Sequence, residues 1–168
     1  MPGTTALQKQ GSESSYYESV KGWLEQILKE KFASYHLEVT AYRQFSNTLQ
    51  LQIDRNRDLI FAFLGDAAPD ITGFVKKDSS SLREFVIVEV KNTPLRLDDI
   101  YQARKYAELF DASYALLIST VEVPAKITRL SEVVFPLLLL PNYKQLTLVS
   151  FQENGGRVEW FRDNPFAK

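Results

Sequence analysis

The sequence predicts an α/β fold, with a mixed β-sheet whose faces are covered by helices. First, two amphipathic helical segments, residues 14–32 and 98–110, alternate with short runs of β-branched and aromatic residues that are typical of strands. Second, a strand at 85–92, the helix at 98–110 and a strand at 113–120 follow one another in the order of a crossover between parallel strands. With 168 residues, 45% of them hydrophobic, the chain is long enough for one domain with a full core.

The first residues lack the side chains that form a core. We expect a flexible tail over residues 1–13 and a single domain over residues 14–168. The tail has neither the apolar segment of a signal peptide nor the pattern of a transit peptide. The longest apolar run, Val133 to Leu140, is far shorter than the ~18 residues that cross a bilayer. We therefore expect a cytoplasmic protein with no membrane segment.

The helix expected at residues 14–32 opens the domain. Ser14 or Ser15 is a suitable N-cap, and Glu18 lies in the first turn, where a carboxylate is favourable. Apolar side chains recur there at helical spacing: Tyr17, Val20, Leu24, Ile27, Leu28 and Phe32. The segments that follow, 37–45, 48–54 and 59–64, are alternating or continuously apolar and are predicted as short strands. Polar turns separate them at residues 46–47 and 54–56.

A hairpin and a helix are expected in the middle of the chain. Residues 70–77 and 83–91 should pair antiparallel across a turn at 78–81. Pro94 then interrupts the chain, and Asp98 is suited to cap the next helix. That helix places four apolar side chains on one face: Ile100, Ala103, Ala107 and Phe110.

The C-terminal part predicts an addition to the sheet. The apolar run 133–140 should be core or an interface. Residues 146–151 and 157–161 should form a β-hairpin, because Asn154-Gly155 between them suits a turn with positive φ.

The composition limits the kinds of site that this fold can carry. The absence of cysteine excludes disulfides and cysteine-based zinc or iron–sulfur sites, and a single histidine, His36, disfavours histidine-rich metal sites and a Ser-His-Asp triad. A bound metal would need oxygen ligands. The net charge of −1 argues weakly against a free-standing nucleic-acid binder. Five basic residues are nevertheless close in sequence: Arg83, Lys91, Arg96, Arg104 and Lys105.

Two charges interrupt the buried strand at 85–92. Glu89 and Lys91 are two positions apart and so emerge on the same face of the strand. In the expected hairpin, Asp70 lies beside Glu89. Two adjacent carboxylates raise each other's pKa unless a cation lies between them, and a hard divalent ion such as Mg²⁺ or Mn²⁺ suits oxygen ligands. Lys91 cannot bind that ion, but it can orient a water molecule and stabilise negative charge on a phosphate.

The order of these residues resembles the PD-(D/E)XK nuclease superfamily, which is restriction-endonuclease-like in fold. The resemblance covers residues 18 to about 120 and rests on this set: Glu18, Pro69-Asp70, Glu89-Val90-Lys91, Gln102 and Tyr106. It implies a restriction-endonuclease-like mixed β-sheet flanked by helices, here with a C-terminal β-hairpin addition. The sequence departs from strong members of the family in a rather long hairpin between the two acids. It also shows no separate DNA-reading domain.

The resemblance assigns a role to each residue. Asp70 and Glu89 would bind Mg²⁺ (or Mn²⁺), with the Val90 carbonyl as a third ligand, and Lys91 would position the attacking water. Glu18 would be an auxiliary acid. Two residues one helical turn apart, Gln102 and Tyr106, would position the substrate or the site. The side chains of Arg96, Arg104 and Lys105 form either a solvated face or contacts to DNA phosphates.

Each motif taken alone also has an ordinary explanation. Glu89 and Lys91 could be an exposed ion pair, and Glu18 could simply complement the helix dipole, with Glu25 on the same face competing for its role. Gln102 and Tyr106 could be a polar residue and a tyrosine at the edge of the core.

The leading functional expectation is a Mg²⁺-dependent endonuclease that hydrolyses DNA phosphodiester bonds in restriction, repair or mobile-element biology. DNA, or else RNA, is the expected partner, and a homodimer or a larger nuclease complex is the candidate assembly. The alternative is a non-catalytic nuclease-fold subunit that acts with a helicase or methylase.

Overall fold

The computed structural model describes residues 11–53, 59–64, 67–153 and 156–167. In this part of the chain, six strands form one sheet in the order β1-β2-β3-β4-β5-β6. Their bounds are β1 Ser34–Val39, β2 Ile71–Lys76, β3 Glu84–Lys91, β4 Tyr114–Ser119, β5 Leu146–Gln152 and β6 Arg157–Trp160. The strands β3, β4 and β5 are parallel, whereas the β1–β2, β2–β3 and β5–β6 pairs are antiparallel. The expected mixed sheet is therefore confirmed.

One face of the sheet is covered by α1 (Tyr17–Lys31), which follows a short 3-10 helix, η1 (Glu13–Tyr16). Four residues of the predicted apolar stripe are buried there against strand residues such as Val86 and Val88, and the other two, Ile27 and Phe32, are partly buried. The predicted capping is wrong, because Ser14 and Ser15 lie inside η1 and no side chain caps α1. The N–H of Tyr17 instead donates to the Ser14 carbonyl, so the 3-10 turn satisfies the helix start.

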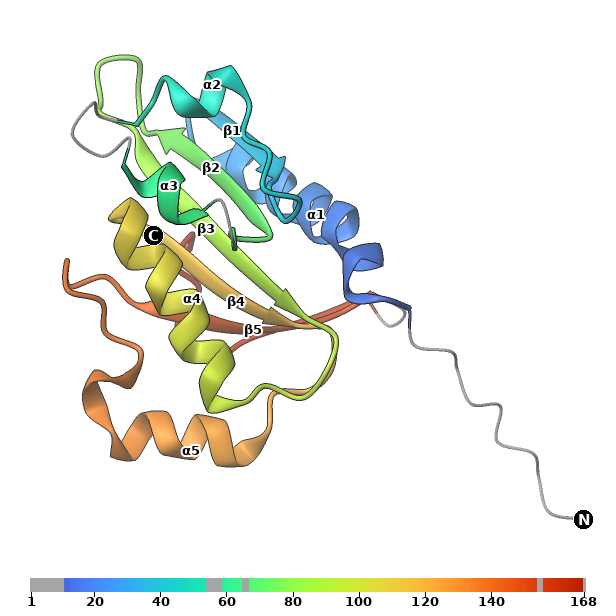
Figure 1. Ribbon diagram of the computed structural model, residues 1–168. Coiled ribbons are helices and arrows are strands. Elements are labelled where there is room, and N and C mark those ends of the chain that lie inside the picture. The colour runs from blue at the N-terminus through green and yellow to red at the C-terminus, as the bar shows by residue number, and fades with distance from the viewer. Residues whose placement is uncertain (1–10, 54–58, 65–66, 154–155, 168) are drawn as a thin grey trace, which may run out of the picture.

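The other face carries α4 (Leu97–Phe110), which crosses over from β3 to the parallel strand β4 (Figure 1). Its four predicted core residues are all buried, as expected from their spacing. The predicted cap, Asp98, is wrong, because the N-cap is Arg96, two residues earlier. Asp98 is already helical, and Asp99 accepts a hydrogen bond from the Arg96 N–H at 2.8 Å.

Two predicted strands are helices. Segment 48–54 overlaps α2 (Asn47–Gln50), and segment 59–64 contains α3 (Ile60–Leu64). The Ser46 hydroxyl accepts the Leu49 N–H, which starts a helix where a strand was expected. Since β1 pairs directly with β2, both segments lie outside the sheet and pack on the same face as α4. The strand predicted at 37–45 ends at Val39, and the turn predicted at 54–56 lies outside the described residues.

The C-terminal part contains a helix that the sequence did not predict, α5 (Ala125–Val133), followed by a 3-10 turn, η3 (Phe135–Leu137). The run 133–140 is divided: Leu137, Leu138 and Leu140 are buried, while Val133 and Phe135 are exposed. The predicted β-hairpin is confirmed as β5–β6 and extends the sheet next to β4. The predicted turn residues Asn154-Gly155 lie outside the described residues. Among the helices described, none has the length and apolar character that crossing a bilayer requires.

Candidate active site

The β2–β3 hairpin brings together the two carboxylates that the sequence singled out. Ile71 pairs with Val88, so the preceding residue Asp70 lies opposite Glu89. Asp70 Oδ2 accepts a hydrogen bond from the Val90 N–H at 2.7 Å, which ties it to the end of β3. Asp70 is 6% exposed and Glu89 is 1% exposed. The juxtaposition predicted for these residues is thus present, and it lies almost entirely out of solvent.

The backbone of Asp70 is held by the end of β1. Its carbonyl accepts hydrogen bonds from the N–H groups of Thr40 at 2.8 Å and Ala41 at 3.2 Å. The buried hydroxyl of Thr40 also bonds the Pro69 carbonyl at 2.6 Å and lies 2.8 Å from the Thr72 hydroxyl. These bonds fix the main chain on both sides of Asp70, so its side chain starts from a rigid base.

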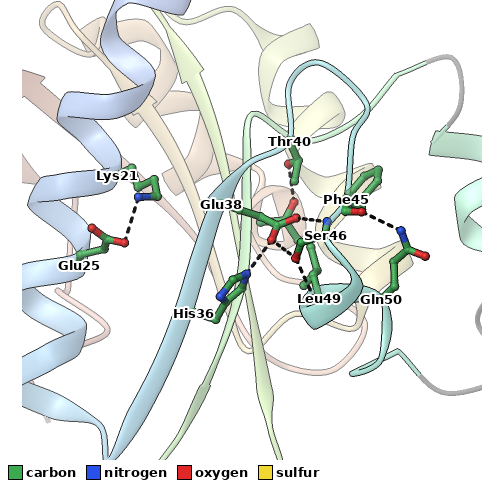
Figure 2. Close-up of polar contacts among 10 residues, drawn as sticks. Lys21, Glu25, His36, Glu38, Thr40, Phe45, Ser46, Leu49 and Gln50 are labelled. Atoms are coloured by element: carbon green, nitrogen blue, oxygen red, sulfur yellow. Dashed lines mark hydrogen bonds and ion pairs between the residues drawn. The ribbon is translucent and has the colours of Figure 1, made fainter.

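A second polar cluster on β1 supports this end of the strand (Figure 2). Glu38 accepts hydrogen bonds from the His36 ring at 2.6 Å and from the Ser46 N–H at 2.8 Å, and also from the Ser46 hydroxyl. Burial alone would raise the pKa of Glu38, but these bonds from Ser46 and His36 hold that pKa below its ordinary value. The cluster fastens the chain that leaves β1 for α2. His36 therefore lies within a strand with a carboxylate partner.

The two carboxylates of the site are held in an unfavourable environment. Burial raises the pKa of Asp70 to about 6, against the opposing effect of the Val90 N–H and the Tyr17 hydroxyl. Burial and then the Asp70 charge raise the pKa of Glu89 to about 8. Burial alone would lower the pKa of Lys91, but Glu89, Glu13 and Asp70 raise it. At neutral pH the lysine is charged, and with no further cation Glu89 keeps its proton.

One oxygen of Glu89 lacks a partner. Glu89 Oε1 lies 3.3 Å from the Lys91 ammonium, but the buried Oε2 has no hydrogen-bond partner. A buried polar atom without a partner is costly, and an ion with oxygen ligands would satisfy it. In the part of the chain that the structure describes, no cluster of three or more His, Cys, Asp or Glu side chains could hold a metal. An ion here would be bound by the carboxylates of Asp70 and Glu89. Its remaining ligands would be other oxygens, such as the Val90 carbonyl and water.

The acid nearest to this pair on the N-terminal helices is Glu13. Glu13 Oε1 lies 3.9 Å from the Lys91 ammonium and 3.4 Å from the Tyr17 hydroxyl, which also hydrogen-bonds Asp70. The predicted Glu18 is exposed and lines a separate hollow with residues of β5 and β6. Neither Glu13 nor Tyr17 was predicted as a site residue. Their spacing could have predicted their position at the site. Glu13 is four residues before Tyr17 and so continues the buried stripe of the helix, whereas Glu18 lies to one side of that stripe.

The pair on α4 faces the same site. Tyr106 is 1% exposed and is hydrogen-bonded to Gln102. Burial raises the pKa of the Tyr106 hydroxyl, and among its charged neighbours the carboxylates of Glu89 and Asp70 raise it further. The hydroxyl therefore stays protonated and lies close to the carboxyl groups of Asp70 and Glu89.

The three predicted phosphate contacts differ in their availability. The Arg96 side chain is 74% exposed, and Lys105 is exposed with its ammonium 4.6 Å from the centre of the Tyr106 ring. Arg104 instead donates to the carbonyls of Pro136 and Leu137 at 2.7 Å each. The guanidinium of Arg104 thus holds η3 against α4, which leaves Arg96 and Lys105 as the accessible cations of the three.

The chain matches no family model, and comparisons with curated proteins and with solved structures find no significant match.

Proposed function

We propose that this chain is a Mg²⁺-dependent nuclease of the PD-(D/E)XK type with a restriction-endonuclease-like fold. The observation that carries the proposal is the buried pair Asp70 and Glu89, with Lys91 beside it and one carboxylate oxygen of Glu89 unpaired. An ion pair at an exposed strand end, the ordinary explanation for Glu89 and Lys91, does not fit, because the Glu89 side chain is only 2% exposed and that of Lys91 is 14% exposed. Burial of this kind is typical of functional sites.

In this proposal the chain holds the metal and guides a water molecule. Asp70 and Glu89, with the Val90 carbonyl, would bind Mg²⁺ or Mn²⁺, and the bound ion would activate water and polarise the scissile phosphate. Lys91 orients that water and stabilises the charge that develops on the phosphate oxygens. Tyr106, hydrogen-bonded to Gln102, keeps its proton and can donate toward the same region. Arg96 and Lys105 are available to contact the phosphates on either side.

The direct test is cleavage by purified protein. With Mg²⁺ or Mn²⁺, the wild type should nick plasmid DNA or degrade single-stranded DNA, branched DNA or RNA. Lys91→Ala and Asp70→Asn should reduce the rate by at least ~100-fold, since each removes charge stabilisation or a metal ligand. The exposed Lys126 offers a matched control, and Lys126→Ala should cut as the wild type does. Equal behaviour of wild type and Lys91→Ala on the whole substrate panel would refute the proposal.

A second candidate is a nuclease-fold subunit that needs a partner, such as a helicase or methylase. The observation in its favour is a set of exposed apolar side chains on α4 and around η3, on a chain with a net charge of −1: Tyr101, Val133, Val134 and Phe135. Exposed apolar patches often mark interaction surfaces. Calorimetry separates the two candidates, because a purely structural subunit would not bind Mg²⁺ or Mn²⁺, whereas the proposed enzyme loses binding on Asp70→Asn.

A further inference from the structure

We propose that residues 11–16, here called the N-terminal strap, close over the catalytic lysine and must give way when a substrate phosphate binds. The inference rests on the proposed function and extends it, because it gives Glu13 the role of a competitor for Lys91. The strap consists of η1 and the two residues before it, and η1 lies beside the tip of β3 (Figure 1).

Polar contacts hold the strap in place. The Asn92 side-chain amide donates to the Gly11 carbonyl at 2.9 Å. Glu13 Oε1 lies 3.9 Å from the Lys91 ammonium and accepts a hydrogen bond from the Tyr17 hydroxyl at 3.4 Å. Two of these contacts end on consecutive residues of the chain at the end of β3. The strap therefore covers the strand end that carries the proposed catalytic lysine.

The anchoring of the strap differs from that of the helix behind it. None of the η1 residues is buried, whereas α1 is fixed by fully buried side chains such as Val20 and Leu24. The Asn92–Gly11 hydrogen bond is exposed and the Glu13–Lys91 ion pair is long, at 3.9 Å, so both hold the strap less firmly than buried apolar side chains hold α1. The strap can therefore lift away from β3 while α1, including Tyr17, stays packed on the sheet.

Glu13 is the carboxylate around Lys91 that a phosphate could replace. The Glu13 side chain is 33% exposed, while that of Glu89 is 2% exposed and Asp70 is 6% exposed. An anion arriving from solvent meets Glu13 first, and it needs the same ammonium that Glu13 now faces. A phosphate and the Glu13 carboxylate repel each other, so binding of one at Lys91 disfavours the other.

The test is Glu13→Gln, which removes the charge and keeps the shape. Cleavage is measured with Mg²⁺, and affinity is measured by anisotropy with a fluorescein-labelled oligonucleotide in Ca²⁺. We expect Glu13→Gln to bind the oligonucleotide about 3- to 10-fold more tightly and to lower KM by the same factor, with kcat little changed. Asn92→Ala, which removes the other tether, should shift affinity in the same direction. Glu30→Gln, an exposed acid on α1, is the matched control and should behave as the wild type.

The outcomes distinguish two roles for Glu13: a competitor for Lys91 within the strap, and an auxiliary acid of the site. A fall in kcat for Glu13→Gln would overturn the strap and make Glu13 an auxiliary acid of the site. Unchanged affinity and KM in both variants would also overturn it. If Lys91→Ala cuts and binds as the wild type does, the proposed function fails and the strap fails with it. If the wild type cuts DNA but Glu13→Gln shows no gain in affinity and no fall in KM, the proposed function stands and only the role of the strap is refuted.

Discussion

Replacing Glu89 by Gln should change how the stability of the fold depends on pH in the absence of metal. In the wild type, burial and the neighbouring Asp70 charge raise the pKa of Glu89 to about 8, whereas the unfolded chain releases this proton near the ordinary pKa of about 4.5. Between these two values the folded state keeps a proton that the unfolded state has lost. The free energy of unfolding therefore falls as the pH rises through this window.

The size of this effect follows from how steeply the free energy of unfolding changes with pH between the two pKa values. One proton held only by the folded state lowers the free energy of unfolding by up to about 1.4 kcal/mol for each pH unit. From about pH 5 to about pH 7, Glu89 should thus lower the free energy of unfolding of the wild type by about 2 to 3 kcal/mol. Gln cannot titrate, so Glu89→Gln loses this contribution. Asp70, whose pKa is also raised, is present in both proteins and tilts both curves in the same direction.

Urea unfolding at a series of pH values, with EDTA present, measures the difference. Tryptophan fluorescence is a suitable signal, because Trp23 on α1 packs against Phe151 of β5 and Trp160 of β6. The control is Glu122→Gln, an exposed acid whose removal should leave the pH profile of the wild type in place. Parallel profiles for wild type and Glu89→Gln would refute the reasoning, because they would show that Glu89 does not hold its proton in the folded state.

Three further predictions test the site and its support. Mg²⁺ at ten times its dissociation constant should stabilise the wild type by about 1.4 kcal/mol, or about 3 °C in Tm, and should leave Asp70→Asn unchanged in differential scanning fluorimetry. Glu38→Gln should cost about 2 kcal/mol at neutral pH, because charged hydrogen bonds at the end of β1 are lost. Since the pKa of Glu38 is lowered in the folded state, that contribution is complete above the ordinary pKa of about 4.5 and disappears as the pH falls through the folded value, so the two denaturation curves should converge in acid. Gly73→Ala should cost about 3 kcal/mol or more, since its Cβ would overlap the His36 carbonyl, while Gly22→Ala meets open space and should gain about 0.5 to 1 kcal/mol.

The central part of the fold was predictable because its signals are local and agree with one another. A hairpin between 70–77 and 83–91 fixes the register once its short turn is recognised, and the register places Asp70 opposite Glu89. The crossover helix was equally clear, since its apolar spacing and its position between two buried strands favour the same answer. Both predictions depend on residues close together in the sequence.

Segment 48–54 was mispredicted because its alternation was taken as a strand signal, and segment 59–64 because a short apolar run does not distinguish a strand from a helix. Of the alternating apolar residues in segment 48–54, Leu49 is fully buried but Leu51 is 82% exposed, so the pattern does not describe one buried face. The capping hydroxyl of Ser46 and packing against the sheet determined the structure instead.

Glu13 was not among the predicted acids, for a different reason. The sequence places Glu18 in the first turn of a helix, and Glu13 at the last position of what reads as a loose tail. The 3-10 turn extends the helical spacing backwards by one turn, and this brings Glu13 onto the face that meets β3. A helix start defined by its caps could not reveal that extension.

The hydrogen bonds of Thr40 have a consequence for how this protein could diversify. The chain leaves the sheet at Thr40 and returns at Pro69 and Asp70, and these three residues are bonded to one another at the base of the excursion. The segment from 40 to 69, thirty positions long, therefore begins and ends at one fixed point. Leu49, Ile60 and Leu64 from this segment are buried in the core and must stay apolar. Substitutions at its exposed positions, by contrast, leave the bonds at Thr40 intact, so the surface next to the site can change while Asp70 keeps its place.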